Sequence, residues 1–128
     1  MYELIIDGPP IALQRHRHAR GRTYDPQSIG KKDLLVRLAP ILKQYPCLDC
    51  ALSVEFIFNF KPPKSKSKKW KRENRYKTTR SDLDNMVKYY SDWANGTLWV
   101  DDSIIVDLHA VKRYSETAYT LIRWEEIY

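Results

Sequence analysis

The clearest strand in this chain is the stretch Leu52-Ser53-Val54-Glu55-Phe56-Ile57-Phe58-Asn59-Phe60. Its large apolar residues stand at every second position, which is the period of a β-strand with one buried face. Pro62 and Pro63 follow directly, and proline ends a strand because it has no N–H for the ladder. The fold therefore contains a β-sheet, and the remaining elements can be assigned outward from this strand.

Upstream of this strand, residues 2–7 alternate well enough to predict a first strand. Residues 14–24 are basic and have no periodic apolar face, which predicts a loop. A helix is predicted to follow, with Asp25 as its N-cap and Pro26 in its first turn. Pro40 is expected to kink or interrupt this helix because its ring clashes with the preceding turn.

Downstream, Ser81 is a good N-cap for a second helix, whose apolar stripe runs over residues 83–94. Residues 104–111 then alternate, and the chain turns back over 117–124, which predicts a C-terminal hairpin. The element order β-α-β-α-β-β predicts an α+β fold with one mixed β-sheet and packed helices. We expect a single domain over residues 1–128.

Composition excludes several classes of protein. The chain has 128 residues and a mass of 15.2 kDa, which is one ordinary domain. No apolar run approaches the ~20 residues of a membrane helix, and the N-terminus has no basic head, so we expect a cytoplasmic protein without signal peptide. Cys47 and Cys50 have no second ligand pair for zinc, which favours two reduced structural thiols.

The charge is strongly uneven. Residues 61–80 hold ten Lys or Arg and one acid, a net +9, whereas the other 108 residues sum to −3. Residues 15–22 add four arginines and no acid. This asymmetry favours a polyanionic partner such as nucleic acid over a basic loop that only aids solubility. The candidate DNA-binding residues are Arg15, Arg17, Arg20, Arg22, Lys64, Lys66, Lys68, Lys69, Lys71, Arg72, Arg75, Lys77 and Arg80.

Residues 61–80 contain no aliphatic side chain, so we expect a mobile loop that an anionic partner would order. Two large aromatic residues lie within it, Trp70 and Tyr76. Either residue can stack on an unpaired base or pack against the body of the protein. The sequence leaves both interpretations open.

Acidic residues gather directly after the basic segment, at positions 82, 84, 101, 102 and 107. Neighbouring carboxylates raise each other's pKa, and a bound hard cation such as Mg²⁺ is a common reason to keep them together. Beside a DNA-binding surface, this arrangement suits phosphodiester hydrolysis. Lys88 lies one helical turn after Asp84 and can support the transition state. The structural alternatives are that Asp82 caps a helix, that Asp101 and Asp102 form a polar turn, that Lys88 only pairs with Asp84, and that Asp107 is structural.

The stretch Arg80-Ser81-Asp82-Leu83-Asp84-Asn85-Met86-Val87-Lys88 resembles the basic-x-D-L-D-N-x-x-K signature of RusA-type Holliday junction resolvases. Asp101-Asp102-Ser103-Ile104-Ile105-Val106 looks like the D-D-x-x-[IV]-[IV] segment of that family, at a similar separation. The resemblance implies that Asp82, Asp84 and Asp102 are the catalytic, Mg²⁺-binding aspartates, with Asp101 assisting, and that Lys88 is the catalytic lysine.

The resemblance also implies a RusA-like fold and a homodimer. It implies a Mg²⁺-dependent enzyme, with Mn²⁺ as a substitute and no small-molecule cofactor. Such an enzyme would make paired nicks in four-way DNA junctions during recombination and repair, in a bacterial or phage-infected cell. The long, Lys-rich segment 61–80 departs from compact family members, which suggests broader branched-DNA substrates. The alternatives are a nuclease acting on RNA and a non-catalytic nucleic-acid-binding module.

Overall fold

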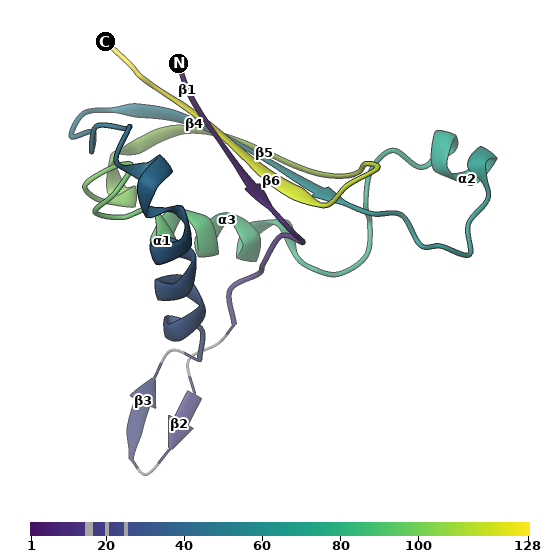
Figure 1. Cartoon of the computed structure of the whole chain (residues 1–128), viewed down its shortest axis with the longest axis horizontal. Coiled ribbons are helices and arrows are strands. Elements are labelled where there is room, and N and C mark those ends of the chain that lie inside the picture. Colours follow the sequence, from purple (N-terminus) through teal and green to yellow (C-terminus); the bar gives the residue numbers. More distant parts are fainter. Residues whose placement is uncertain (15–16, 20, 25) are drawn as a thin grey trace.

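The computed structural model describes residues 1–14, 17–19, 21–24 and 26–128. Its main sheet has the strand order β1-β6-β4-β5 (Figure 1). The four strands are β1 (Tyr2–Asp7), β4 (Leu52–Phe60), β5 (Ile105–Tyr114) and β6 (Tyr119–Glu126). β6 is antiparallel to both β1 and β4, whereas β5 runs parallel to β4. The sheet is therefore mixed, which confirms the predicted α+β fold.

Helices cover one face of this sheet (Figure 1). They are α1 (Ser28–Leu42) and α3 (Leu83–Trp93). The alternating residues of β4, from Leu52 to Phe58, point to this side and are at most 1 % exposed. They pack against apolar residues of both helices in one core cluster, which confirms the strand predicted from the period-2 pattern.

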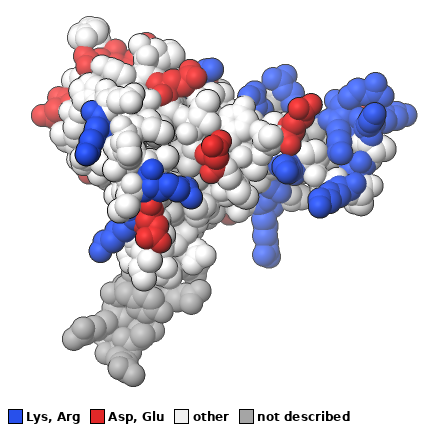
Figure 2. All heavy atoms as spheres, viewed as in Figure 1, with Lys and Arg blue, Asp and Glu red and all other residues white. Residues whose placement is uncertain are grey.

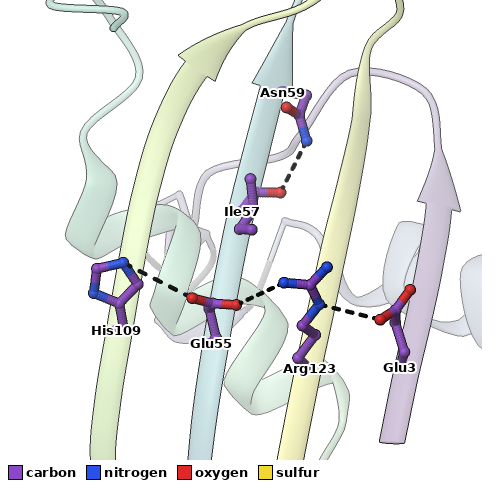
Figure 3. Close-up of polar contacts among 6 residues, drawn as sticks. All are labelled: Glu3, Glu55, Ile57, Asn59, His109 and Arg123. Carbon is purple, nitrogen blue, oxygen red and sulfur yellow. Dashed lines mark hydrogen bonds and ion pairs between the residues drawn. The ribbon is translucent and has the colours of Figure 1, made fainter.

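The opposite face of the sheet carries a row of polar side chains that runs across all four strands (Figure 3). Arg123 on β6 donates to Glu3 on β1 at 3.1 Å and to Glu55 on β4 at 3.3 Å. His109 on β5 lies 3.9 Å from Glu55. Because side chains alternate between the two faces of a strand, this polar row follows from the same β4 pattern that builds the core.

The predicted C-terminal hairpin is wrong. β5 and β6 are consecutive in the chain, but β4 lies between them and pairs with both. The turn after β5 crosses the end of β4, where Ser115 N donates to Phe60 O at 2.9 Å. Alternation predicts that each segment is a strand but does not identify its partners. β4 takes a central position because its large side chains need neighbours on both edges to be buried.

The predicted loop over residues 14–24 is also wrong, because β2 (Arg17–Ala19) and β3 (Arg22–Tyr24) pair as a short antiparallel hairpin. Gly21 lies at its turn with φ of 74°, a conformation that favours glycine. Gln27 is the N-cap of α1, and the predicted cap Asp25 lies outside the described residues. α1 continues two residues past Pro40, so this proline removes one backbone donor near the end of the helix without interrupting it.

The second predicted helix is confirmed as α3, although Asp82 rather than Ser81 occupies its N-cap position. Both cysteines are free thiols. In the described part of the chain, no helix is long and apolar enough to cross a membrane.

Candidate active site and nucleic-acid interface

Two acidic side chains are presented at the N-terminus of α3. Asp82 is the N-cap residue, yet its side chain makes no capping hydrogen bond. Asp84 lies in the first turn, and its side chain is 73 % exposed. The interpretation of Asp82 as a simple capping residue therefore lacks its expected contact. Both carboxylates are at the surface, where they can bind a cation.

Lys88 lies one turn further along α3 on the same side. Its Nζ is 3.9 Å from Asp84 Oδ2, and its side chain is 63 % exposed. A surface pair with i,i+4 spacing contributes only about 0.3–0.5 kcal/mol to helix stability. This pair is too weak to hold the ammonium in place, so Lys88 can turn towards a bound phosphate.

A second group of acids precedes β5, at the 3-10 turn η1 (Asp102–Ile104). Asp101 Oδ2 accepts a hydrogen bond from Ser103 N at 3.2 Å. Hydrogen bonds from the Ser103 side chain and backbone lower the pKa of Asp101. Asp101 is thus the residue that caps this turn, whereas the exposed Asp102 lines a hollow of about 270 Å³ together with Lys88.

A groove between α3 and β5 connects these residues. The hollow that contains Asp102 and Lys88 adjoins a second hollow lined by Asp84, Lys88 and Leu108. Lys88 borders both hollows and so lies between the two carboxylates. We call this feature the α3–β5 groove.

Among residues 1–14, 17–19, 21–24 and 26–128, no three acidic, His or Cys side chains form a ready-made metal site. The structure therefore does not assemble Asp82, Asp84 and Asp102 into one cluster. However, Mg²⁺ usually binds only one or two carboxylates and completes its shell with water and substrate phosphate oxygens. Exposed carboxylate oxygens beside the groove fit that donor set, and the predicted metal ligands remain a prediction.

Asp107 lies away from this groove. Its carboxylate accepts a hydrogen bond from Ser53 Oγ at 3.0 Å, across the β4–β5 pair. Its place in β5 points it to the face that carries His109 and Glu55, opposite the helices. The structural interpretation of Asp107 fits this position.

Sequence reasoning missed Lys112 as a site residue. Its Nζ donates to Thr79 O at 2.6 Å and to Ser81 O at 2.7 Å, which ties the segment before α3 to β5. The Arg80–Ser81 peptide bond in this segment is cis. Burial and the charge of Lys77 lower the pKa of Lys112, while the Asp82 carboxylate acts in the opposite direction. The only feature of the sequence that could have indicated it is the basic pair Lys112-Arg113 near the end of β5.

Residues 61–80 form what we call the basic arm. It leaves the end of β4, projects beyond the sheet, carries the helix α2 (Lys68–Glu73) and returns to β5 (Figure 1). The predicted loop therefore contains a helix. Ser67 caps α2 by accepting from Trp70 N at 3.1 Å, and the Trp70 ring packs on Tyr114 with 5.5 Å between centroids. A helix of six residues held by one aromatic contact has no apolar periodicity, so the sequence pattern could not reveal it.

Positive side chains gather on the basic arm, whereas both signs mix on the body visible in Figure 2. The exposed ones are Lys61, Lys64, Lys66, Lys68, Lys69, Lys71, Arg72, Arg75 and Arg80. Lys77 differs, because it is half-buried with its Nζ 5.1 Å from the Phe60 ring centroid and donates to Thr79 Oγ1. Of the other predicted DNA contacts, Arg15 and Arg20 lie outside the described residues, and Arg17 and Arg22 lie in β2 and β3.

The arm also borders a hollow of about 610 Å³ at its root. Its charged lining consists of three lysines, Lys61, Lys64 and Lys71, and one carboxylate, Glu116. Several ammonium groups around one open hollow attract an anion such as a backbone phosphate.

The family model of endodeoxyribonuclease RusA matches residues 7–125. This chain belongs to the RusA family. The matched range includes the basic arm, the N-terminus of α3 and η1. A search of curated proteins found no match. Family membership indicates that this chain is a nuclease, a hydrolase that acts on DNA, and confirms the resemblance seen in its sequence.

Proposed function

We propose that this RusA-family protein is a Mg²⁺-dependent endodeoxyribonuclease that resolves four-way Holliday junctions by paired symmetric nicks. The observation that carries the proposal is the α3–β5 groove, where Asp84, Lys88 and Asp102 lie along one edge of the sheet. The basic arm returns to the same strand, β5, through backbone hydrogen bonds. Metal-binding oxygens and a phosphate-binding surface thus adjoin one element.

In this proposal Asp82, Asp84 and Asp102 hold Mg²⁺, with Asp101 assisting, and Mn²⁺ can replace it. When bound, the metal supplies an activated water and stabilises charge on the phosphate oxygens. The exposed carboxylates of Asp82 and Asp84 at the start of α3 and that of Asp102 at η1 provide the hard oxygen donors. Asp101 assists by fixing η1, since it holds the backbone of Ser103.

Lys88 has the position expected of an electrostatic catalyst. Its ammonium borders both hollows of the groove and is only loosely paired with Asp84. It can therefore approach the scissile phosphate and neutralise negative charge as that charge develops.

The basic arm binds backbone phosphates in this proposal. Its exposed lysines and arginines, including those of α2, provide contacts that do not depend on base sequence. The homodimer follows from the reaction, because two symmetric cuts require two active sites related by a two-fold axis. Sedimentation of the protein at micromolar concentration should give the mass of two 15.2 kDa chains.

The test is nicking of a synthetic four-way DNA junction, with linear duplex as the competing substrate. Wild type in Mg²⁺ should make paired cuts, and EDTA should abolish them. Asp82→Asn should bind the junction as well as wild type does and cut at least about 100-fold more slowly. Asp107→Asn is the matched control, because the same change is made on the opposite face of the sheet, and it should cut normally.

Either of two outcomes would contradict the proposal and indicate another function. Tight junction binding by wild type without any cleavage would indicate a non-catalytic binding protein. Preferential cleavage of an RNA junction of the same shape would move the substrate class from DNA to RNA.

A further inference from the structure

An exposed aromatic side chain lies where the basic arm rejoins the sheet. Tyr76 is 56 % exposed, although it is a large residue in a structured part of the chain. The other arm aromatic, Trp70, is half-buried and packs on Tyr114. The structure thus distinguishes Trp70 from Tyr76, although the sequence left the same two roles open for both. Trp70 holds the arm together, and the ring of Tyr76 faces solvent.

The backbone of Tyr76 is nevertheless well fixed. Tyr76 forms an antiparallel bridge with Arg113 of β5. On either side of it, Tyr114 N donates to Arg75 O at 2.9 Å and Lys77 N donates to Lys112 O at 3.3 Å. The exposed ring is therefore mounted on the edge of the main sheet, so a ligand that binds it would not have to order the backbone.

Tyr76 is also close to the candidate catalytic residues. Asp82 is six positions further along the chain, and six Cα–Cα steps span at most about 20 Å. The link is held to β5, because Lys112 binds Thr79 O and Ser81 O. A distance of 20 Å corresponds to about six base-pair steps of 3.4 Å. A base stacked on Tyr76 would thus belong to a nucleotide near the scissile phosphate.

The surroundings of the Tyr76 ring favour a nucleobase as its ligand. The Arg75 guanidinium lies 5.6 Å from the Tyr76 centroid, over one face of the ring. A base stacked on the other face would have this cation available for an adjacent phosphate. Base stacking on aromatic side chains combined with basic contacts is the usual way in which proteins bind unpaired nucleotides.

We propose that Tyr76 is a stacking platform for an unstacked base at the branch point of the DNA substrate. This inference rests on the proposed junction cleavage and adds a source of selectivity to it. Within a continuous duplex each base is stacked on two neighbours and offers no open face. A branch point interrupts the stack, so Tyr76 favours branched over linear DNA without reading its sequence.

The test uses four-way junctions that carry 2-aminopurine, one position at a time, within six nucleotides of the branch point. This base fluoresces when unstacked and is quenched when stacked. Binding is measured in Mg²⁺-free buffer so that the DNA stays intact. Wild type should quench the probe at one or two positions. Tyr76→Phe keeps the ring and should quench equally.

Tyr76→Ala should lose this quenching and bind the junction about 5- to 150-fold more weakly, with unchanged affinity for linear duplex. Tyr128→Ala is the matched control. It removes a tyrosine at the C-terminus that is more exposed than Tyr76 and lies at the other end of the sheet from the basic arm (Figure 1), and it should behave as wild type.

The outcomes separate this inference from the proposed function. If Tyr76→Ala quenches the probe and binds the junction as wild type does, the stacking role is wrong while junction cleavage by wild type still stands. If junction and duplex affinities fall by the same factor, Tyr76 only supports the arm, and the inference is also wrong. If wild type neither prefers nor cuts junctions, the proposed function itself fails.

Discussion

Lys112→Met should reduce DNA cleavage far more than DNA binding. The substitution keeps the length and the apolar stem of the side chain but removes the ammonium. That ammonium donates to Thr79 O at 2.6 Å and to Ser81 O at 2.7 Å. Without these bonds the segment directly before Asp82 is no longer held to β5. The carboxylates at the start of α3 should then occupy a range of positions.

The effect on stability can be estimated from the two contacts. Hydrogen bonds made by a charged group each contribute about 1.5–3 kcal/mol. One of the two is solvent-exposed, and burial lowers the pKa of Lys112, which means that burying the charge has an energetic cost. We therefore expect a net loss of about 1–3 kcal/mol in the free energy of unfolding. The entropy of unfolding is about 2.1 cal/mol/K per residue. Over 128 residues, this loss of free energy should lower Tm by about 4–11 °C.

The effect on cleavage should be larger. A displacement of about 1 Å in a catalytic group can reduce the rate about 100-fold. The assay is single-turnover cleavage of a four-way junction with enzyme in excess, at a temperature well below both Tm values. Lys112→Arg restores the charge and should recover part of the rate. Lys69→Met removes one charge from α2 and should weaken binding with an unchanged single-turnover rate.

Either of two results would refute this reasoning. A lowered Tm with a cleavage rate within about threefold of wild type would mean that the segment before α3 needs no anchor. Equal losses in rate constant and in DNA affinity would mean that Lys112 contacts the DNA directly instead of positioning Asp82.

Three further predictions follow from the same structure. Junction affinity should fall steeply with salt, with a log–log slope of about −0.9 per neutralised phosphate; a slope near zero would exclude the basic arm as the DNA-binding surface. Phe56→Ala should cost about 3–5 kcal/mol in urea unfolding because Phe56 is fully buried, whereas Ile5→Ala, at a half-exposed site on the open face, should cost far less. The pKa of Asp101 is lowered from 3.8, so its hydrogen bonds stabilise the fold above that pH and are lost in acid. The Tm difference between wild type and Asp101→Asn should therefore shrink as the pH falls below 3.8, and a difference that grows in acid would contradict this.

Local patterns in the sequence identified most strands and helices of this protein. The alternation over residues 52–60 and the stripe over 83–94 are strong because each element buries one face, and burial imposes a period. The short hairpin of β2 and β3 and the helix α2 have no such period. They depend on a glycine turn and on one packed tryptophan, so pattern analysis treated both as loops.

The pairing of the strands could not be predicted from the sequence for a different reason. β5 and β6 follow each other closely, and proximity in the chain favours a hairpin. Yet β4 inserts between them because its large apolar side chains require two neighbouring strands. The same placement makes β5 an edge strand, which leaves it available to the basic arm.

The sequence predicted the residues of the candidate site but not the contacts that hold the segment before α3 to β5. The motif identified Asp82, Asp84, Lys88 and Asp102, and the structure places three of them along the α3–β5 groove. The basic pair Lys112-Arg113 does not by itself indicate the role of Lys112, since that role depends on carbonyl groups more than 30 residues away in the chain. Contacts of this kind form only when the sheet edge and the arm meet.

The end of β5 links the basic arm to the candidate catalytic residues through three consecutive residues. Lys112 holds the segment before α3. Arg113 bridges to Tyr76 and donates to the buried amide oxygen of Asn59 at 2.9 Å. Tyr114 packs on Trp70 of the arm. Because these residues share one strand, we expect that DNA bound to the arm would also displace or fix the segment that carries Asp82. DNA binding and the position of Asp82 should therefore be coupled. Lys112 would provide this coupling, because its ammonium binds the segment before Asp82.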